Sequence, residues 1–140
     1  MRLSRRSLIS ALTVLIVLVC LACGETNPVQ PTPPIINDTF NGTLAPGGRA
    51  THAFTIQTAG GLDVTVISLS PDPTITIGVG LGKPAGDGVC TLTLENKAAH
   101  QASLISASVT VAGTYCFAIY DVGGIAADTT TDYIVTLTHF

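Results

Sequence analysis

The chain has 140 residues, a formal net charge of −3, charged side chains at 11% of positions and no tryptophan. Beyond residue 22, three cations stand against nine acids, which gives a net charge of −6. That balance lacks the basic patches that nucleic-acid binding requires, and it disfavours electrostatic attachment to anionic lipid. We therefore expect no nucleic-acid partner.

The first 22 residues have the pattern of an export signal. Three arginines, at positions 2, 5 and 6, precede an uncharged, mainly apolar run over residues 8–21. This run is shorter than the roughly 20 residues of a transmembrane helix and typical of a signal-peptide helix. We predict a signal peptide over 1–22, with an uncleaved membrane anchor as the alternative. The two adjacent arginines also resemble part of a twin-arginine export motif, but we expect the general export route.

The end of this segment resembles a bacterial lipobox. Residues 21–24 read LACG, in which Cys23 would be acylated and become the new N-terminus. Cys20 departs from the pattern, which usually has leucine there. Gly24, in place of an aspartate, resembles the sequence that directs lipoproteins to an outer membrane. We therefore predict a lipid anchor at Cys23 and a place in the bacterial envelope, at the outer membrane.

The number of cysteines supports this prediction. Removal of 1–22 leaves Cys23, Cys90 and Cys116, and an unpaired thiol is unusual in an exported protein. Lipidation of Cys23 leaves an even pair. The alternative is an ordinary signal-peptidase cut after Ala22, which would release a soluble periplasmic or extracellular protein.

Residues 23–37 are proline-rich and have no apolar periodicity. Such a segment forms a semi-rigid, polyproline-like tether that extends about 3.1 Å per residue, or roughly 40 Å in all. A proline-bearing edge strand is the alternative. From residue 38 to residue 140 the composition is uniform, and about 100 residues suffice for one domain with a modest core.

The domain has the composition of a β-protein, because Thr, Val and Ile fill short runs that Gly, Pro, Asn and Asp separate. The predicted strands are 38–44, 49–57, 61–70, 74–81, 89–94, 102–110, 113–120 and 131–139. We therefore predict a single all-β domain, an antiparallel sandwich or barrel of about eight strands. The pattern does not determine the order of the strands.

The segment 74–81 alternates most clearly. Ile75, Ile77, Val79 and Leu81 share one face, and threonines and glycines occupy the other. Period-two alternation predicts one buried face and one solvated face.

Cys90 and Cys116 each fall in a predicted strand. In an oxidising compartment we expect a disulfide between them, which would stabilise the fold by roughly 3–4 kcal/mol. Two buried free thiols are the alternative.

Five short motifs resemble the bacterial pre-peptidase C-terminal (PPC) domain family. They are residues 40–44 (FNGTL), 54–56 (FTI), 61–66 (GLDVTV), 113–119 (GTYCFAI) and 133–137 (YIVTL). The resemblance covers most of 38–139 and implies a jelly-roll-like sandwich of the kind that accompanies exported enzymes. Some members of that family bind matrix polymers and some bind calcium. No peptidase or other catalytic domain precedes the module in this sequence, so we do not expect a targeting role for a protease.

Candidate ligand sites are few. Asp121, Asp128 and Asp132 bracket one loop, and calcium prefers such oxygen ligands. They lack the spacing of a known calcium loop, and aspartate is common in turns, so we expect no cofactor or metal and keep calcium as the weaker alternative. Sugar binding would need an exposed aromatic ring, and Tyr120 is the candidate for it.

The sequence contains no recognisable nucleophile or metal motif. We therefore expect a non-catalytic surface lipoprotein whose sandwich acts as a binding or adhesion module. Its partner would be an envelope component, an extracellular polysaccharide or a protein. A purely structural envelope lipoprotein is the alternative.

Overall fold

The structure is a computed structural model that describes residues 31–140, and a compact unit spans Pro33–Phe140. The predicted signal peptide, Cys23 and most of the predicted tether lie outside the described residues. In the part of the chain that is described, no helix is long and apolar enough to span a membrane.

Eight strands form two four-stranded antiparallel sheets, which confirms the predicted all-β sandwich. The strands are β1 (Ile36–Leu44), β2 (Arg49–Ile56), β3 (Gly60–Ser70), β4 (Ile77–Gly86), β5 (Val89–Ala99), β6 (Leu104–Val109), β7 (Gly113–Asp121) and β8 (Thr131–His139).

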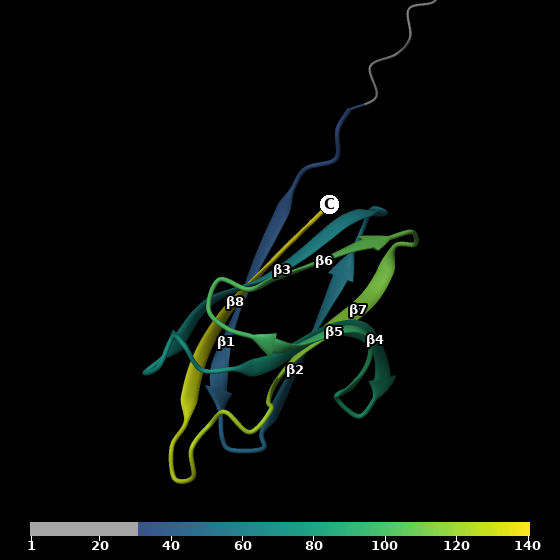
Figure 1. Cartoon of the computed structure of the whole chain (residues 1–140). Helices are drawn as coiled ribbons and strands as arrows, with labels where there is room; N and C mark the ends of the chain where they lie inside the picture. Colours follow the sequence, from purple (N-terminus) through teal and green to yellow (C-terminus); the bar gives the residue numbers. More distant parts are fainter. Residues whose placement is uncertain (1–30) are drawn as a thin grey trace, which may run out of the picture. The chain divides into compact units, whose positions relative to one another are not determined.

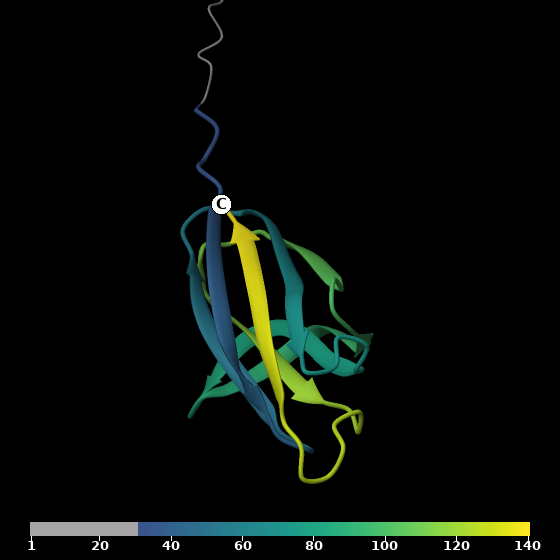
Figure 2. The same ribbon diagram turned by 90° about the vertical axis from the view of Figure 1, so that its left-hand side faces the viewer.

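One sheet has the order β1-β8-β3-β6 and the other has the order β2-β7-β4-β5 (Figure 1). The first strand thus lies beside the last, and the second beside the seventh. This nested pairing is the topology of a jelly roll. Figure 2 shows β1 and β8 side by side, and Ile36 pairs with His139, so both ends of the domain lie at the same end of the sandwich.

The core lies between the sheets and consists mainly of β-branched side chains and leucine. Its largest fully buried members include Phe117, Ile119, Ile77, Val79, Val64, Val135 and Leu137. Alternation places these residues on the inward faces of β3, β4, β7 and β8, as the period-two pattern predicted.

Strand β4 departs from the prediction in two ways. It begins at Ile77 rather than at residue 74, and it continues to Gly86. Its second face is also buried, because Gly78, Gly80 and Gly82 are all covered. The expectation of one solvated face is therefore wrong for this strand.

The reason is that β5 curls over the outer face of β4. A Cβ atom at Gly82 would lie 1.8 Å from the backbone oxygen of Thr91, and one at Gly78 would lie 2.2 Å from the ring of Tyr120. Only residues without side chains permit this approach. The glycines read as a solvated face therefore form the surface against which β5 and Tyr120 pack.

The disulfide between Cys90 and Cys116 is present, as expected, and its Cα atoms are 5.8 Å apart. Cys90 lies on β5 and Cys116 on β7, and β4 lies between these strands in the sheet. In a flat sheet, strands two positions apart are separated by roughly 9.6 Å. The disulfide therefore bridges over β4 and fastens the curled strand to the centre of the sheet.

Candidate functional site

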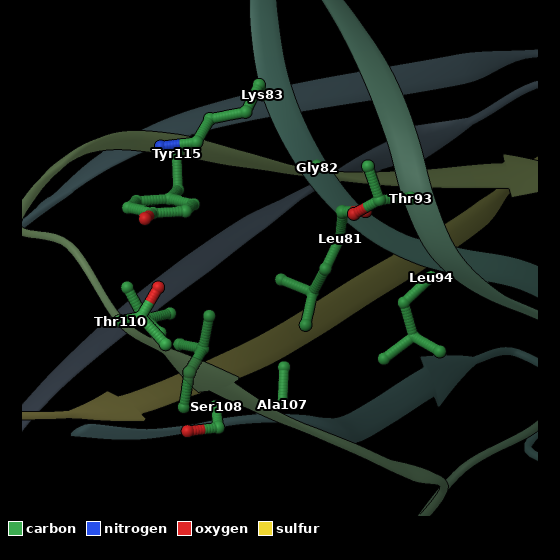
Figure 3. A pocket seen from close by; sticks show the side chains of 11 residues that line it. Leu81, Gly82, Lys83, Thr93, Leu94, Ala107, Ser108, Thr110 and Tyr115 are labelled. Carbon is green, nitrogen blue, oxygen red and sulfur yellow. The ribbon is translucent and has the colours of Figure 1, made fainter. Parts of the chain in front are cut away.

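A cleft opens between the two sheets on the side where β5 and β6 are the edge strands. It has a volume of about 210 Å³ and is drawn in Figure 3. Its apolar walls are Leu62 of β3, Leu81 of β4, Leu94 of β5, and Ala107 and Val109 of β6. The core thus extends to the surface at this seam instead of being closed.

Lys83 stands above Tyr115 at one side of the cleft (Figure 3). Its Nζ atom lies 3.3 Å from the centre of the Tyr115 ring, a cation–π contact. The Tyr115 hydroxyl donates a hydrogen bond of 2.7 Å to the carbonyl oxygen of Val111. The anchored ring therefore holds an ammonium group beside the apolar walls.

Lys83 forms no ion pair with any other described residue. None of the described residues that line the cleft is acidic. By contrast, Lys97 pairs with Glu95 at 3.1 Å, and Arg49 donates a 2.8 Å hydrogen bond to the backbone oxygen of Cys90. The cleft therefore combines apolar walls with an ammonium group that no carboxylate of the described chain neutralises.

Tyr120, the candidate for sugar binding, lies at the end of β7. Its ring lies over Gly78 on the outer face of β4, and the Arg49 guanidinium lies 5.5 Å from its centre. Its hydroxyl donates a 2.8 Å hydrogen bond to Oε2 of Glu95. Burial and this bond raise the pKa of Tyr120. The ring covers glycine rather than standing free, so it is a weak platform for a sugar.

The three aspartates predicted for calcium do not converge. Asp121 accepts backbone hydrogen bonds from Gly47, Gly123, Gly124 and Ile125 at 2.8–3.1 Å. Partial burial acts to raise the pKa of Asp121, but these four donors outweigh it and hold the pKa below its usual range. The carboxylate therefore shapes its loop and joins it to the turn at Gly47.

The other two aspartates are also explained by local structure. Asp132 accepts a 2.6 Å hydrogen bond from the hydroxyl of Thr43, and Asp128 adopts a left-handed turn conformation with φ of 65°. Within residues 31–140, no group of three or more His, Cys, Asp or Glu side chains could hold a metal ion. Calcium binding stays a prediction, without support from this arrangement.

A second polar feature lies between β2 and β8. His52 Nε2 is 2.7 Å from the Tyr133 hydroxyl, and its ring stacks on Phe117 with centres 4.9 Å apart. Burial lowers the pKa of His52 and raises the pKa of Tyr133. These aromatic rings are half-buried or buried, so this cluster stabilises the core rather than presenting a site.

The cleft residues were missed in the sequence. Tyr115 falls within the predicted strand 113–120 with no signal of a site, and Lys83 falls outside the predicted strand that ends at residue 81. A signal was nevertheless present, because Ile77, Val79, Leu81 and Lys83 follow one period-two series. A lysine that continues an inward-facing series marks a place where the core reaches solvent.

The fold is shared with proteins of known structure. No family model matches the chain, and no curated protein is a significant match. The structure is similar to that of the Yersinia pseudotuberculosis-derived mitogen, with a TM-score of 0.53 and 15% identity, over 78% of this chain and 88% of that one.

It is also similar to Aeromonas hydrophila PliG, a periplasmic lysozyme inhibitor of g-type lysozyme. That match has a TM-score of 0.54 and 10% identity and covers 79% of this chain and 91% of the other. At such low identity these likenesses show the β-sandwich fold alone. Membership of the PPC family stays a prediction.

Proposed function

We propose that the chain is an exported, lipid-anchored and non-catalytic binding protein of the bacterial envelope, which holds its partner at the cleft between the sheets. One observation carries this proposal: the core of the sandwich opens to solvent beside Lys83, and no described acid pairs with that lysine. Apolar cavities with a few convergent polar groups are the usual form of a binding site.

Export is supported by three independent features. The N-terminal sequence has the pattern of a signal peptide, the Cys90–Cys116 disulfide suits an oxidising compartment, and PliG, which has a similar fold, is periplasmic. The acylation of Cys23 rests on the lipobox-like sequence and on cysteine parity.

A macromolecular partner is supported by the similar fold of PliG, whose name describes an inhibitor of a protein, g-type lysozyme. An extracellular polysaccharide is the other partner that the sequence suggested. The cleft favours the binding proposal over a purely structural role, because a structural lipoprotein would gain stability by closing its core.

Cross-linking in intact cells tests the site. A photoreactive residue replaces Leu94 in the cleft wall, and a matched variant carries it at Val122 in the β7–β8 loop. The exposed fractions of these side chains are 41% and 39%. We expect a discrete adduct from Leu94 that is absent from Val122. Equal adducts, or none from Leu94, would overturn the assignment of the partner to the cleft.

A second experiment tests the anchor. Intact mass and membrane fractionation of the expressed chain are compared with those of Cys23→Ser. We expect residues 23–140 with acyl chains in the membrane fraction, and a soluble, unacylated protein from the variant. If the variant stays equally membrane-bound, the lipid-anchor proposal is wrong.

A further inference from the structure

The geometry points to a specific ligand chemistry for the cleft: a single aliphatic chain that ends in a carboxylate, as in a short or medium-chain fatty acid. This inference rests on the proposed function in that it uses the same cleft, and it places a fatty acid there rather than a protein or a polysaccharide. It goes further because it names the ligand from the walls, the charge and the position of the site.

The walls match an alkyl chain. Leu62, Leu81, Leu94, Ala107 and Val109 contribute aliphatic surface from four strands. The volume of about 210 Å³ exceeds the roughly 150 Å³ of an apolar cavity that accepts benzene. The cleft can therefore hold a chain of about eight carbons, and its aliphatic walls suit an alkyl chain better than a sugar.

The charge matches a carboxylate. Lys83 is the one charged residue that lines the cleft within the described part of the chain. A cation that has no ion-pair partner and lies beside an apolar surface attracts a ligand that carries both a negative charge and apolar groups. The domain as a whole is acidic, so this attraction is local to Lys83.

The Tyr115 ring contributes by fixing the position of that charge. The contact of 3.3 Å between Nζ and the ring centre uses one face of the ammonium group, and Lys has three N–H donors. The hydroxyl groups of Ser108 and Thr110 also line the cleft. A carboxylate beside Lys83 would thus find the remaining ammonium N–H donors, while its alkyl chain covers the leucines.

The position of the cleft is consistent with a ligand from a membrane. Leu62 in the cleft wall pairs with His139, and His139 pairs with Ile36 at the beginning of β1. The cleft thus lies toward the end of the sandwich at which the chain enters the domain. A lipid-anchored protein would therefore carry the cleft toward the end of the domain to which its tether is joined.

The experiment is a calorimetric titration of the exported chain carrying Cys23→Ser, purified without detergent. The probe is octanoate below its micelle concentration, with octanol and octylammonium as matched probes of the same chain length. We expect octanoate to bind at least about tenfold more tightly than octanol, since a hydrogen-bonded charge pair is lost with the alcohol. Octylammonium should bind most weakly.

Two variants and one control assign the binding to the site. Lys83→Met keeps the length of the side chain and should weaken octanoate about tenfold while leaving octanol unchanged. Ala107→Leu narrows the cleft and should weaken both probes. Lys97→Met is the control: Lys97 lies on β5, the strand beside β4, and does not line the cleft. This variant should bind octanoate as the parent chain does. Urea unfolding of each variant verifies that it is folded.

Three results would overturn the inference. They are equal affinity for octanoate and octanol, equal losses in Lys83→Met and Lys97→Met, and no octanoate binding to the parent chain. A separate titration uses a peptide that ends in leucine, with either a free or an amidated C-terminus. If the peptide with the free carboxylate binds more tightly than octanoate, the fatty-acid assignment is wrong and the ligand is a protein C-terminus. Absence of octanoate binding leaves the cross-linking at Leu94 intact as the test of the proposed function.

Discussion

Replacement of Gly82 by alanine tests the packing of β5 across the outer face of β4. The added Cβ atom would lie 1.8 Å from the backbone oxygen of Thr91 and 2.6 Å from its carbonyl carbon. Ordinary Cβ contacts begin at 3.4 Å. The two strands would have to separate by about 1.6 Å, and backbone atoms cannot rotate away as a flexible side chain can.

The expected cost follows from that separation. Overpacking by one carbon costs about 1–3 kcal/mol, and each weakened hydrogen bond between β4 and β5 adds about 1 kcal/mol. The lower chain entropy of alanine in the unfolded state offsets about 0.5–1 kcal/mol. We therefore expect Gly82→Ala to lower the free energy of unfolding by about 3 kcal/mol.

Urea unfolding of the exported chain with Cys23→Ser measures this effect. With a slope near 1.5 kcal/mol/M, the midpoint should fall by about 2 M with an unchanged slope. Gly61→Ala in β3 is the matched control, because the nearest atom to its Cβ is 3.8 Å away, and its midpoint should stay equal or rise slightly. A Gly82→Ala midpoint equal to that of Gly61→Ala would refute the close approach of β5.

Further predictions concern the disulfide, pH and the β7–β8 loop. Removal of both Cys90 and Cys116 should lower the free energy of unfolding by about 3.5 kcal/mol, given their separation of 26 residues; an unchanged urea midpoint would contradict this. Because burial lowers the pKa of His52 in the folded state, the unfolded chain binds more protons below pH ~6.5, and stability should fall as the pH drops through that range. Urea midpoints between pH 7 and about 5.5 should show this slope, and His52→Phe, which retains the aromatic stacking, should flatten it; an equal slope in both proteins would refute the assignment. Asp121→Ala should cost about 2 kcal/mol through the four lost backbone bonds, and Asp121→Asn, which retains one acceptor, should cost less in the same assay; equal losses would show that the charge and not the acceptors matters. A chelator and excess calcium should give the same melting temperature, and a higher one in calcium would revive the predicted site.

Much of the fold was predictable because it depends on local sequence patterns. Period-two alternation and the turn residues between the runs located eight strands. The structure places the turn between β4 and β5 at residues 86–88, where Gly86 and Gly88 adopt positive φ. The inward positions Ile77, Val79 and Leu81 were likewise correct. Such patterns are local because each strand must bury one face, whichever strand lies beside it.

The pairing of strands could not be read in this way. Nothing in β1 specifies that its partner is β8, about a hundred residues later, because antiparallel neighbours require only compatible surfaces. The same limit explains why a solvated face was wrongly expected for β4. In the sequence its glycines suggest a face with nothing packed on it, whereas in the structure they allow β5 to approach closely.

The sequence by itself determined that this is an acidic, all-β chain with Cys90 and Cys116 in separate strands, and its first 22 residues predict export. Those properties follow from composition, charge and local periodicity. The tertiary structure decided the jelly-roll order, the curl of β5 over Gly82 and the cleft that joins Lys83 to Tyr115 and Leu94. These three residues lie on three different strands, and only long-range pairing between the strands brings them together.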